Sequence, residues 1–587
     1  MRLAALVAAI GALLPASVRA GNSTYLNPVL PGWHSDPSCT QVDGIFYCVT
    51  STFISFPGLP IYASKDLLNW KLVSHVWNRE SQLPGVSWNT TGQQDGMYAA
   101  TLRHRDGLFY VICEYLGVGS GNVGVVFKSP DPFDEPAWSD AVTFQPRNID
   151  PDLFWDDDGK AYVATMSVVL QEINLETGEL SQPPVSLWNG TGGVWPEGPH
   201  MYKKDGYYYL MIAEGGTSTN HSITIARSQN LLGPYEGYEN NPILTNRGTD
   251  EYFQTVGHGD LFQDPKGNWW GLCLSTRSGP EYLNYPMGRE AVMFAVTWDK
   301  GEWPVLQPVQ GNMTGWELPP QTRDVPGDGP FNTDDDVYDF KKGTKIPRNL
   351  IHWRVPREGA FSTTAKGLQV VPSRNNLTGT ETTPELSGRA GLSFVGRRQT
   401  NTLFHFEVDI SFSPKSVGQE AGATVFLTQF NHIDIGVVLL SPNATYSSAS
   451  KSSSNEKAQL ALRFRAEGTG VAPPPNIVPV PPSWAEGDIR LRIQTVNATH
   501  YSLSAMSARD PDPAKALALG TASAELVSGG EGSFVGSLLG VYATCNGAGE
   551  GVTCPEGGNA HFTRWRYTGL GQYISATEVV KSQDWND

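Results

Sequence analysis

Carboxylates that recur at the same offset from a repeated turn are the residues of this sequence best placed to do chemistry. Eight or nine residues before the glycine of each turn stand five residues: Asp36, Tyr98, Asp150, Glu197 and His258. Burying an ionised group without a partner costs several kcal/mol. Asp36 and Asp150 both precede proline, as ordinary turn residues do, yet three carboxylates at equivalent positions favour a shared site.

Converging carboxylates of this kind suit the hydrolysis of a glycosidic bond. One carboxylic acid gives a proton to the departing oxygen, while a second carboxylate activates water or attacks the sugar carbon. Like charges held close push the two pKa values apart, so one group stays protonated near neutral pH while the other remains ionised. Asp36, Asp150 and Glu197 are therefore the candidates for acid–base catalysis.

A repeat of a tight turn followed by an aromatic strand predicts the elements that must position these residues. The five copies centre on Gly44, Gly107, Gly159, Gly206 and Gly267. Asp-Gly supplies the positive φ angles of a two-residue hairpin turn, so each copy marks a hairpin. Units of about four strands repeated radially form a β-propeller, and five copies predict five blades over residues 26–318. The alternative is an irregular all-β domain in which such turns recur by chance.

A second all-β domain is predicted after the repeat ends. Residues 319–336 are rich in Pro, Gly and Asp, as expected of a linker. Residues 337–575 show short alternating strands without the earlier repeat. This pattern favours a β-sandwich.

The first twenty residues have the pattern of a secretory signal peptide. Arg2 precedes an apolar run from Leu3 to Leu14, and small residues at Val18 and Ala20 precede the expected cleavage point. The run is too short to span a bilayer. Eight Asn-x-Ser/Thr sequons accompany it: Asn22, Asn89, Asn189, Asn220, Asn312, Asn376, Asn443 and Asn497. We therefore expect a secreted, extracellular glycoprotein that does not associate with membranes.

The six cysteines agree with export, because thiols oxidise outside the cell. Their spacing shows no zinc-binding pattern. We expect two local disulfides and one long-range bridge: Cys39–Cys48, Cys545–Cys554 and Cys113–Cys273.

The overall composition excludes several classes of protein. A chain of 587 residues exceeds what one core usually fills. Its 62 Gly and 42 Pro are spread along the chain, which rules out a helical bundle or coiled coil. The formal charge of −17 argues against a nucleic acid partner, whose binding draws on clustered Lys and Arg.

Four segments resemble the signature motifs of glycoside hydrolase family 43, in that family's order: residues 27–38, 149–154, 195–200 and 256–260. The resemblance implies an all-β fold, a five-bladed β-propeller followed by a concanavalin-A-like β-sandwich, and an inverting mechanism. It implies that Asp36 is the general base, that Glu197 is the general acid, and that Asp150 orients the acid and raises its pKa. Four further segments resemble the sandwich appended to family 43 β-xylosidases: residues 394–399, 404–408, 532–536 and 562–567.

The resemblance also marks two residues beside the carboxylates. Arg289, in residues 286–290, matches the family's substrate-contacting arginine, with a surface salt bridge as the alternative. His258 lies in a segment that in many relatives holds a hydrated metal ion, usually calcium. Calcium prefers oxygen ligands, so a structural ion in the propeller channel and a hydrogen-bonded channel residue remain equal alternatives. The chemistry itself requires no cofactor.

Five aromatic residues are candidates for substrate binding. Residues 51–53 and 56–58 match family 43 xylosidases, so that Phe53 or Phe56 would form an apolar floor for the sugar. Trp195 lies in the motif of the acid, and Tyr98 lies on the second inner strand. Phe534 is the candidate for a sandwich loop that narrows the pocket and favours attack at chain ends.

The leading hypothesis is an enzyme that releases terminal β-1,4-linked xylose from xylan or xylo-oligosaccharides of the plant cell wall. An α-L-arabinofuranosidase that trims arabinoxylan is the alternative, because the hydroxyls of the two pentoses can overlay in one pocket. Two departures from the family's pattern adjoin the pocket, at residues 34–35 and 97–100, and leave the sugar open. A non-catalytic carbohydrate-binding propeller would need no acid and base, and a sialidase-like propeller would need an arginine cluster.

Overall fold

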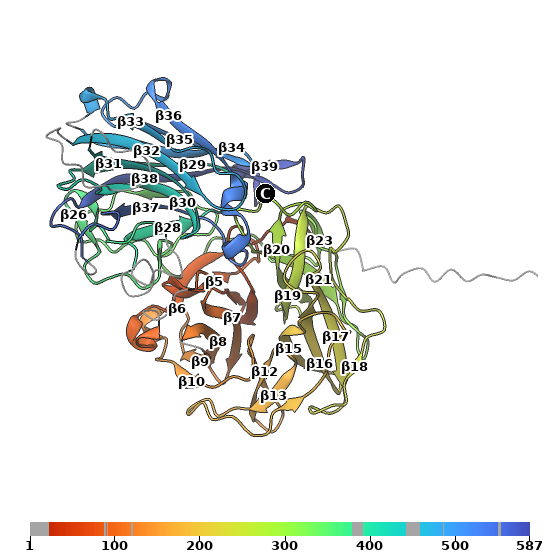
Figure 1. The fold of residues 1–587 in the computed structure, drawn as a ribbon. Helices are drawn as coiled ribbons and strands as arrows, with labels where there is room; N and C mark the ends of the chain where they lie inside the picture. The colour runs from red at the N-terminus through yellow and green to blue at the C-terminus, as the bar shows by residue number, and fades with distance from the viewer. Residues whose placement is uncertain are drawn as a thin grey trace, which may run out of the picture.

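The computed structural model describes residues 23–86, 90, 92–118, 121–378, 391–441, 458–484, 487–549 and 553–586. These residues form two all-β domains that lie against each other (Figure 1). The predicted signal segment and the sequons Asn22, Asn89 and Asn443 lie outside the described residues. None of the helices in the described ranges is long and apolar enough to cross a membrane.

The first domain contains five four-stranded antiparallel sheets, the blades of a propeller. Blade one contains β2 (Ser38–Val42), β3 (Ile45–Val49), β5 (Gly58–Ser64) and β6 (Lys71–Trp77). Blade two contains β7 (Gly96–Arg105), β8 (Leu108–Val118), β9 (Gly121–Ser129) and β10 (Val142–Phe144). Blade three contains β11 (Asp152–Trp155), β12 (Ala161–Thr165), β13 (Val169–Glu172) and β14 (Val185–Ser186).

The last two blades complete the ring. Blade four contains β15 (Glu197–Lys204), β16 (Tyr207–Glu214), β17 (Ser222–Ser228) and β18 (Glu236–Gly237). Blade five contains β19 (Phe253–Gln263), β20 (Trp269–Arg277), β21 (Glu290–Thr297) and β22 (Val305–Leu306). The first strand among the described residues, β1 (Ser23–Leu26), pairs with β23 (Asn312–Gly315), which follows blade five. The predicted five-bladed propeller is confirmed.

The repeated turns fall into two kinds. Asp43, Asp106 and Asp205 have φ angles of 50°, 52° and 52°, and each is followed by a positive-φ glycine, as a two-residue hairpin turn requires. In blades three and five the connections are five-residue loops, at residues 156–160 and 264–268. The prediction of two-residue turns is therefore wrong for these two copies, although both still join the first two strands of a blade.

The second domain is a sandwich of two antiparallel sheets. The nine-stranded sheet contains β24 (Asp336–Tyr338), β26 (Phe361–Thr364), β27 (Gly367–Val370), β29 (Leu403–Phe412), β34 (Ile489–Asn497), β35 (His500–Ser507), β36 (Leu517–Ser523), β38 (Ala560–Tyr573) and β39 (Val579–Lys581). The eight-stranded sheet contains β4 (Ser55–Phe56), β25 (Ile351–Trp353), β28 (Phe394–Arg398), β30 (Glu420–Thr428), β31 (Asn431–Leu440), β32 (Gln459–Glu467), β33 (Asn476–Pro479) and β37 (Leu538–Thr544). The predicted sandwich is confirmed.

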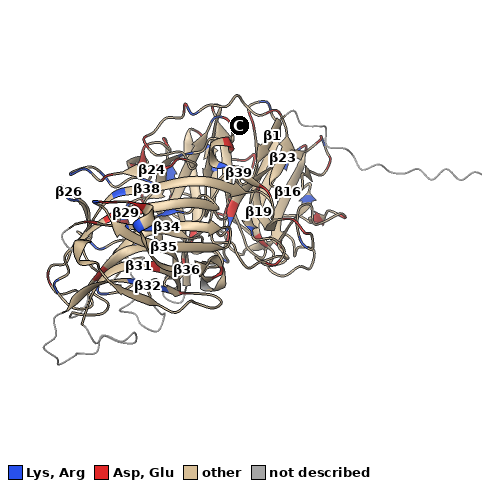
Figure 2. Cartoon of the chain, turned by 90° about the horizontal axis from the view of Figure 1, so that it is seen from above, with Lys and Arg blue, Asp and Glu red and all other residues tan. Residues whose placement is uncertain are grey.

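Short 3-10 helices interrupt the loops of both domains. They are η1 (Glu80–Gln82), η2 (Glu135–Ala137), η5 (Pro482–Trp484), η6 (Pro513–Lys515), η7 (Ala524–Val527), η8 (Gly530–Gly532) and η9 (Ser582–Asp584). Acidic and basic residues are scattered over the strands and loops of both domains (Figure 2).

The propeller contributes a strand to the sandwich. β4 belongs to blade one in sequence, yet it pairs with β25, with His352 opposite Phe56. Trp33, Phe53 and Ile54 of the propeller are buried in the hydrophobic core of the sandwich. The two domains are therefore continuous through one sheet, and the segment that carries Phe53 is held by both.

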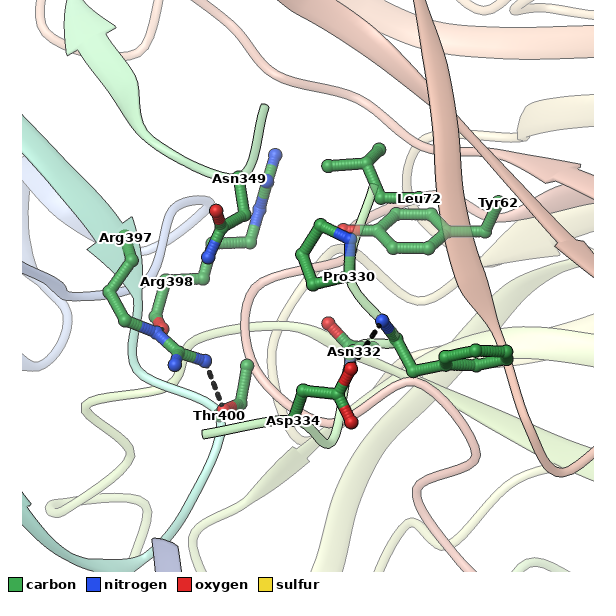
Figure 3. Close-up of a pocket in the computed structure, with 10 residues that line it drawn as sticks. Tyr62, Leu72, Pro330, Asn332, Asp334, Asn349, Arg397, Arg398 and Thr400 are labelled. Carbon is green, nitrogen blue, oxygen red and sulfur yellow. Dashed lines mark hydrogen bonds between the residues drawn. The ribbon is translucent and has the colours of Figure 1, made fainter. Parts of the chain in front are cut away.

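The linker also packs against the propeller rather than hanging between the domains. Pro330 accepts a hydrogen bond of 3.0 Å from the backbone N–H of Leu72, and Asn332 donates one of 2.9 Å to the carbonyl of Pro31. A cavity of about 20 Å³ lies where linker, blade one and sandwich meet (Figure 3). This space suits about one water molecule, which makes it a packing gap. The sandwich extends past the predicted end at residue 575, because β39 pairs with β38.

Two disulfides are present, Cys39–Cys48 and Cys545–Cys554. The predicted long-range bridge is wrong, because Cys113 and Cys273 are unpaired and buried. Cys113 lies in the core of blades one and two, while Cys273 lies in the core around blade five. Each thiol therefore behaves as a small hydrophobic residue in its own core.

Candidate active site

The inner strands of the five blades bring the residues of the predicted layer to one end of the channel. Asp36 and Asp150 lie two residues before β2 and β11, and Glu197 is the first residue of β15. Tyr98 and His258 lie within β7 and β19 at irregularities in strand pairing. Such β-bulges redirect side chains and are common beside active sites.

The backbone at three of these residues has an uncommon conformation. Asp36, Asp150 and His258 have φ angles of 51°, 59° and 46°. Left-handed conformations cost roughly 1–3 kcal/mol for residues other than glycine and cluster at functional sites. The chain is therefore held in strained turns at the point where these side chains enter the channel.

Asp36 is surrounded by groups that stabilise its negative charge. The hydroxyl of Ser51 donates a hydrogen bond of 2.7 Å to Asp36 Oδ2. His258 Nδ1 lies 3.4 Å and Arg289 Nη1 lies 3.5 Å from Asp36 Oδ1. Only 5% of Asp36 is exposed. A buried carboxylate with a hydroxyl donor and a guanidinium beside it is suited to hold and activate a water molecule.

Asp150 is held in a fixed orientation next to the other carboxylates. The backbone N–H of Gly198 donates a hydrogen bond of 3.0 Å to Asp150 Oδ2. Burial raises the pKa of Asp150, and the charge of Asp36 adds to this effect, while His258 and Arg289 oppose it. The hydrogen bond links Asp150 to the residue that follows Glu197, which places the two carboxylates next to each other.

Glu197 has the protonation behaviour of a general acid. Burial raises the pKa of Glu197 to about 8, with the negative charges of Asp150 and Asp36 contributing and Arg289 opposing. Glu197 is therefore protonated near neutral pH, while only 8% of the residue is exposed. A carboxylic acid that keeps its proton until it meets a departing oxygen is what glycosidic bond cleavage requires.

The sandwich supplies one wall of the site. The guanidinium of Arg289 lies 4.1 Å from the ring centroid of Phe534, and Phe534 stacks with Phe53 at 6.3 Å. Tyr98 meets both rings edge-on. The carbonyl of Phe534 accepts a hydrogen bond of 2.8 Å from Ser35, the neighbour of Asp36. The structure therefore joins residues that are more than 400 positions apart in the sequence.

One guanidinium nitrogen of Arg289 makes no hydrogen bond to any residue in the described ranges. Its Nη2 is buried and has no hydrogen-bond partner among the residues that the structure describes. Burying an unsatisfied guanidinium donor is costly. This donor is suited to a sugar hydroxyl, and the surface salt bridge considered as an alternative is wrong, because Arg289 is only 6% exposed.

Two predicted aromatic residues lie outside this group. The ring of Phe56 packs edge-on against Trp77 at 5.2 Å, in the core of blades one and two. Between the two alternatives for the apolar floor, the structure therefore favours Phe53. Trp195 is 58% exposed and lies beside Gly216, and it is not among the buried residues that surround the carboxylates.

Sequence reasoning missed two buried groups beside the site. His221 packs against β19, the strand that carries His258, and the Nδ1 of His221 lies 2.9 Å from the carbonyl of Thr255 in that strand. Burial lowers the pKa of His221 to about 3. Glu114 on β8 is fully buried, and burial together with the charge of Asp150 raises its pKa to about 9. The strand pairing of Glu114 with Tyr98 is the signal that could have placed it there.

The described residues offer a calcium ion few side-chain ligands. Calcium takes six to eight oxygen ligands. Among the described residues, no group of three His, Cys, Asp or Glu side chains is placed to hold a metal ion. The carboxylates that follow Asp150 and His258 along the channel, Asp152 and Asp260, are already paired with Arg103. His258 faces Asp36 across the channel, with its Nδ1 3.4 Å from Asp36 Oδ1, and a hydrated calcium ion held through His258 stays a prediction.

Comparison with protein families gives two matches. The model of glycosyl hydrolases family 43 matches residues 25–304. The model of the β-xylosidase C-terminal concanavalin A-like domain matches residues 337–568. Both ranges fall on the two domains seen in the structure.

Known proteins show the same likeness over most of the chain. The chain is 34% identical over 540 residues to a non-reducing end α-L-arabinofuranosidase of Bacteroides ovatus, covering 91% of this chain and 93% of the relative. It is 34% identical over 439 residues to a xylosidase/arabinosidase of Butyrivibrio fibrisolvens, covering 70% and 79%.

Solved structures agree with these relatives. A Bacteroides ovatus xyloglucan protein of family GH43 superposes with a TM-score of 0.77 at 32% identity, covering 93% of this chain and all of the other. A xylan β-1,4-xylosidase of Bacillus halodurans superposes with a TM-score of 0.77 at 26% identity, covering 92% and 99%. The chain therefore belongs to glycosyl hydrolase family 43, and it is a glycosidase with that family's concanavalin A-like C-terminal domain.

Proposed function

We propose that the protein is a secreted, inverting glycosidase that releases terminal pentose units from plant cell-wall polysaccharides or their oligosaccharides. Asp36 activates the water, Glu197 protonates the leaving oxygen, and Asp150 orients Glu197 and keeps its pKa high. The observation that carries the hydrolytic role is the buried cluster of Asp36, Asp150 and Glu197, in which Arg289 lies beside Asp36. Burial and the charge of Asp150 raise the pKa of Glu197 in this cluster to about 8.

The wall formed by the sandwich supports action at chain ends. Phe534 packs against Arg289 and Phe53 and is tied to Ser35, so the site is closed on this side. The catalytic carboxylates are nearly buried, which suits a single terminal sugar better than a long chain passing through. Trp195, two residues before Glu197, offers an exposed aromatic face for the next sugar along the chain.

Xylose is the first candidate for the released sugar. Relatives of Bacillus subtilis and Formosa agariphila carry the name β-xylosidase, at 32% and 29% identity. The second candidate is α-L-arabinofuranose, which is favoured by the Bacteroides ovatus α-L-arabinofuranosidase that matches over 91% of the chain. Discrimination between two pentoses requires only about 1–3 kcal/mol, so a few contacts decide it.

Export is supported by independent features of the chain. The first twenty residues have the signal pattern, and two disulfides are present. Among the five described sequons, Asn189, Asn220, Asn312 and Asn497 are exposed, and Asn376 is half-buried. Exposed sequons are accessible to glycosylation in the secretory pathway.

The acid role of Glu197 is tested by Glu197→Gln with leaving groups of different basicity. Turnover of xylobiose, whose leaving alcohol needs a proton, should fall about 10²–10⁴-fold. Turnover of a dinitrophenyl β-xyloside, whose leaving group departs as a stable anion, should fall far less. Asp36→Asn is the matched control, because loss of water activation should slow both substrates alike. Equal losses for Glu197→Gln on both substrates would contradict the assignment.

The sugar and the stereochemistry are tested together. The protein is incubated with linear xylo-oligosaccharides and, separately, with arabinoxylan, and the first-formed product is observed by proton NMR. Release of α-xylose from β-linked oligosaccharides supports an inverting β-xylosidase. Release of β-arabinose alone supports the arabinofuranosidase, and retention of configuration contradicts the inverting mechanism for either sugar.

A further inference from the structure

A second layer of polar residues lies directly below the catalytic layer in the propeller channel. Each of the five inner strands contributes one member: Ser38, Arg103, Asp152, His200 and Asp260. Four of them follow a residue of the catalytic layer by two or three positions, so they lie next along the same strands. The guanidinium of Arg103 is the common partner of the other four.

The contacts of Arg103 reach every blade. Its Nη1 lies 2.7 Å from Asp260 Oδ2, and its Nη2 lies 2.6 Å from Asp152 Oδ1. Nη2 also lies 3.1 Å from His200 Nδ1, and Nη1 donates a hydrogen bond of 3.3 Å to the hydroxyl of Ser38. Since Arg103 itself belongs to blade two, one side chain links the inner strands of all five blades.

The two carboxylates need a cation because both are out of contact with water. Asp152 and Asp260 are 0% and 1% exposed. Burial by itself would raise the pKa of Asp260, but Arg103 and His200 hold it well below its usual range. Tyr202 and Ser38 donate further hydrogen bonds of 2.7 and 2.6 Å to Asp260. Two carboxylates with hydroxyl groups around them would also suit a divalent cation if Arg103 were absent.

We propose that Arg103 is the propeller's own channel cation, which neutralises Asp152 and Asp260 in place of a metal ion and fastens the five blades together. The folded protein then needs no divalent cation for stability. Removal of the guanidinium leaves two carboxylates that a calcium ion can share. The proposal concerns the stability of the propeller and does not depend on the sugar that the enzyme releases.

The test is the melting temperature of the full-length protein in EDTA and in excess calcium chloride. The wild-type protein should melt at the same temperature in both. Arg103→Ser should melt about 5–10 °C lower in EDTA, because it leaves buried carboxylates unpaired. Calcium should raise its melting temperature again, since a ligand bound only by the folded state stabilises that state.

Three further variants make the test specific. Arg103→Ser/Asp260→Asn should lose the calcium response, because one carboxylate of the pair is gone. Arg103→Lys should stay insensitive to EDTA and lie between wild type and Arg103→Ser in stability, and it serves if the serine variant does not fold. Arg105→Met is the matched control, since Arg105 lies on the same strand and pairs with the exposed Asp106.

Three results would overturn the proposal. The first is a wild-type protein that loses stability in EDTA and regains it with calcium. The second is an Arg103→Ser variant as stable as wild type. The third is an Arg103→Ser variant whose reduced stability does not respond to calcium. The wild-type comparison alone decides the question of a required metal ion, whatever the variants do.

Discussion

Replacing Asp150 with asparagine isolates the electrostatic contribution of this residue to Glu197. Asparagine has nearly the same shape, its carbonyl can accept the hydrogen bond of Gly198, and it tolerates the positive φ of this position better than most residues. The substitution therefore removes a negative charge while leaving the turn in place.

The size of the effect follows from the pKa of Glu197. Its rise from 4.5 to about 8 corresponds to roughly 5 kcal/mol in favour of the protonated form, at about 1.4 kcal/mol per unit. Burial is the largest cause and the charge of Asp150 is the second. Without that charge Glu197 ionises more easily, so its pKa should fall by about one unit.

The assay is the pH dependence of kcat/KM on xylobiose. The general acid must be protonated, so activity disappears as the pH rises through the pKa of Glu197. This basic limb should lie near pH 8 in the wild type and about one unit lower in Asp150→Asn. Asp157→Asn, a change at an exposed residue of the same blade, should leave the limb in place. A limb that stays or moves upward in Asp150→Asn would refute the electrostatic role of Asp150.

Two other residues give sharp predictions. Phe534→Ala removes the ring that packs against the guanidinium of Arg289, so kcat/KM should fall about tenfold. The melting temperature should stay close to that of the wild type. Val471→Ala, at an exposed site of the sandwich, is the control. Glu114→Gln should stabilise the protein as the pH rises. The raised pKa of Glu114, about 9, makes the folded state hold a proton that the unfolded state releases above about pH 4.5, a cost of roughly 3 kcal/mol at pH 7. Urea unfolding should show this gain at pH 7 and a much smaller one at pH 5; equal stability of variant and wild type at both values would contradict the pKa shift.

The catalytic layer could be predicted from the sequence because a propeller repeats one local pattern. Each blade begins with an inner strand and a hairpin, so an offset of eight residues before Gly44, or of nine before Gly206, reaches an equivalent height in the channel. That offset placed Asp36, Asp150 and Glu197 together before any coordinates. Local disulfides were predictable for the same reason, since Cys39 and Cys48 face each other across one hairpin.

Contacts between distant segments could not be obtained in this way. The sequence offers Cys113 and Cys273 as a pair, but their strands belong to different blades with separate cores. The sequence offers Phe53 and Phe56 as equal candidates for the apolar floor of the sugar site. In the structure β4 pairs with the sandwich, Phe53 stacks with Phe534, and Phe56 packs against Trp77 in the propeller core. Nothing local indicates that Phe534 reaches Arg289.

The sequence alone determined the five blades, the sandwich and the three carboxylates, because these depend on short-range turn chemistry and on a repeated spacing. The tertiary structure decided what surrounds the carboxylates. Packing brings together the groups that raise the pKa of Glu197. It also places Phe534 of the sandwich against Arg289, and it surrounds Arg103 with polar residues from the other four blades. Burial and charge act through space, so their strength is set by neighbours that the order of residues along the chain does not reveal.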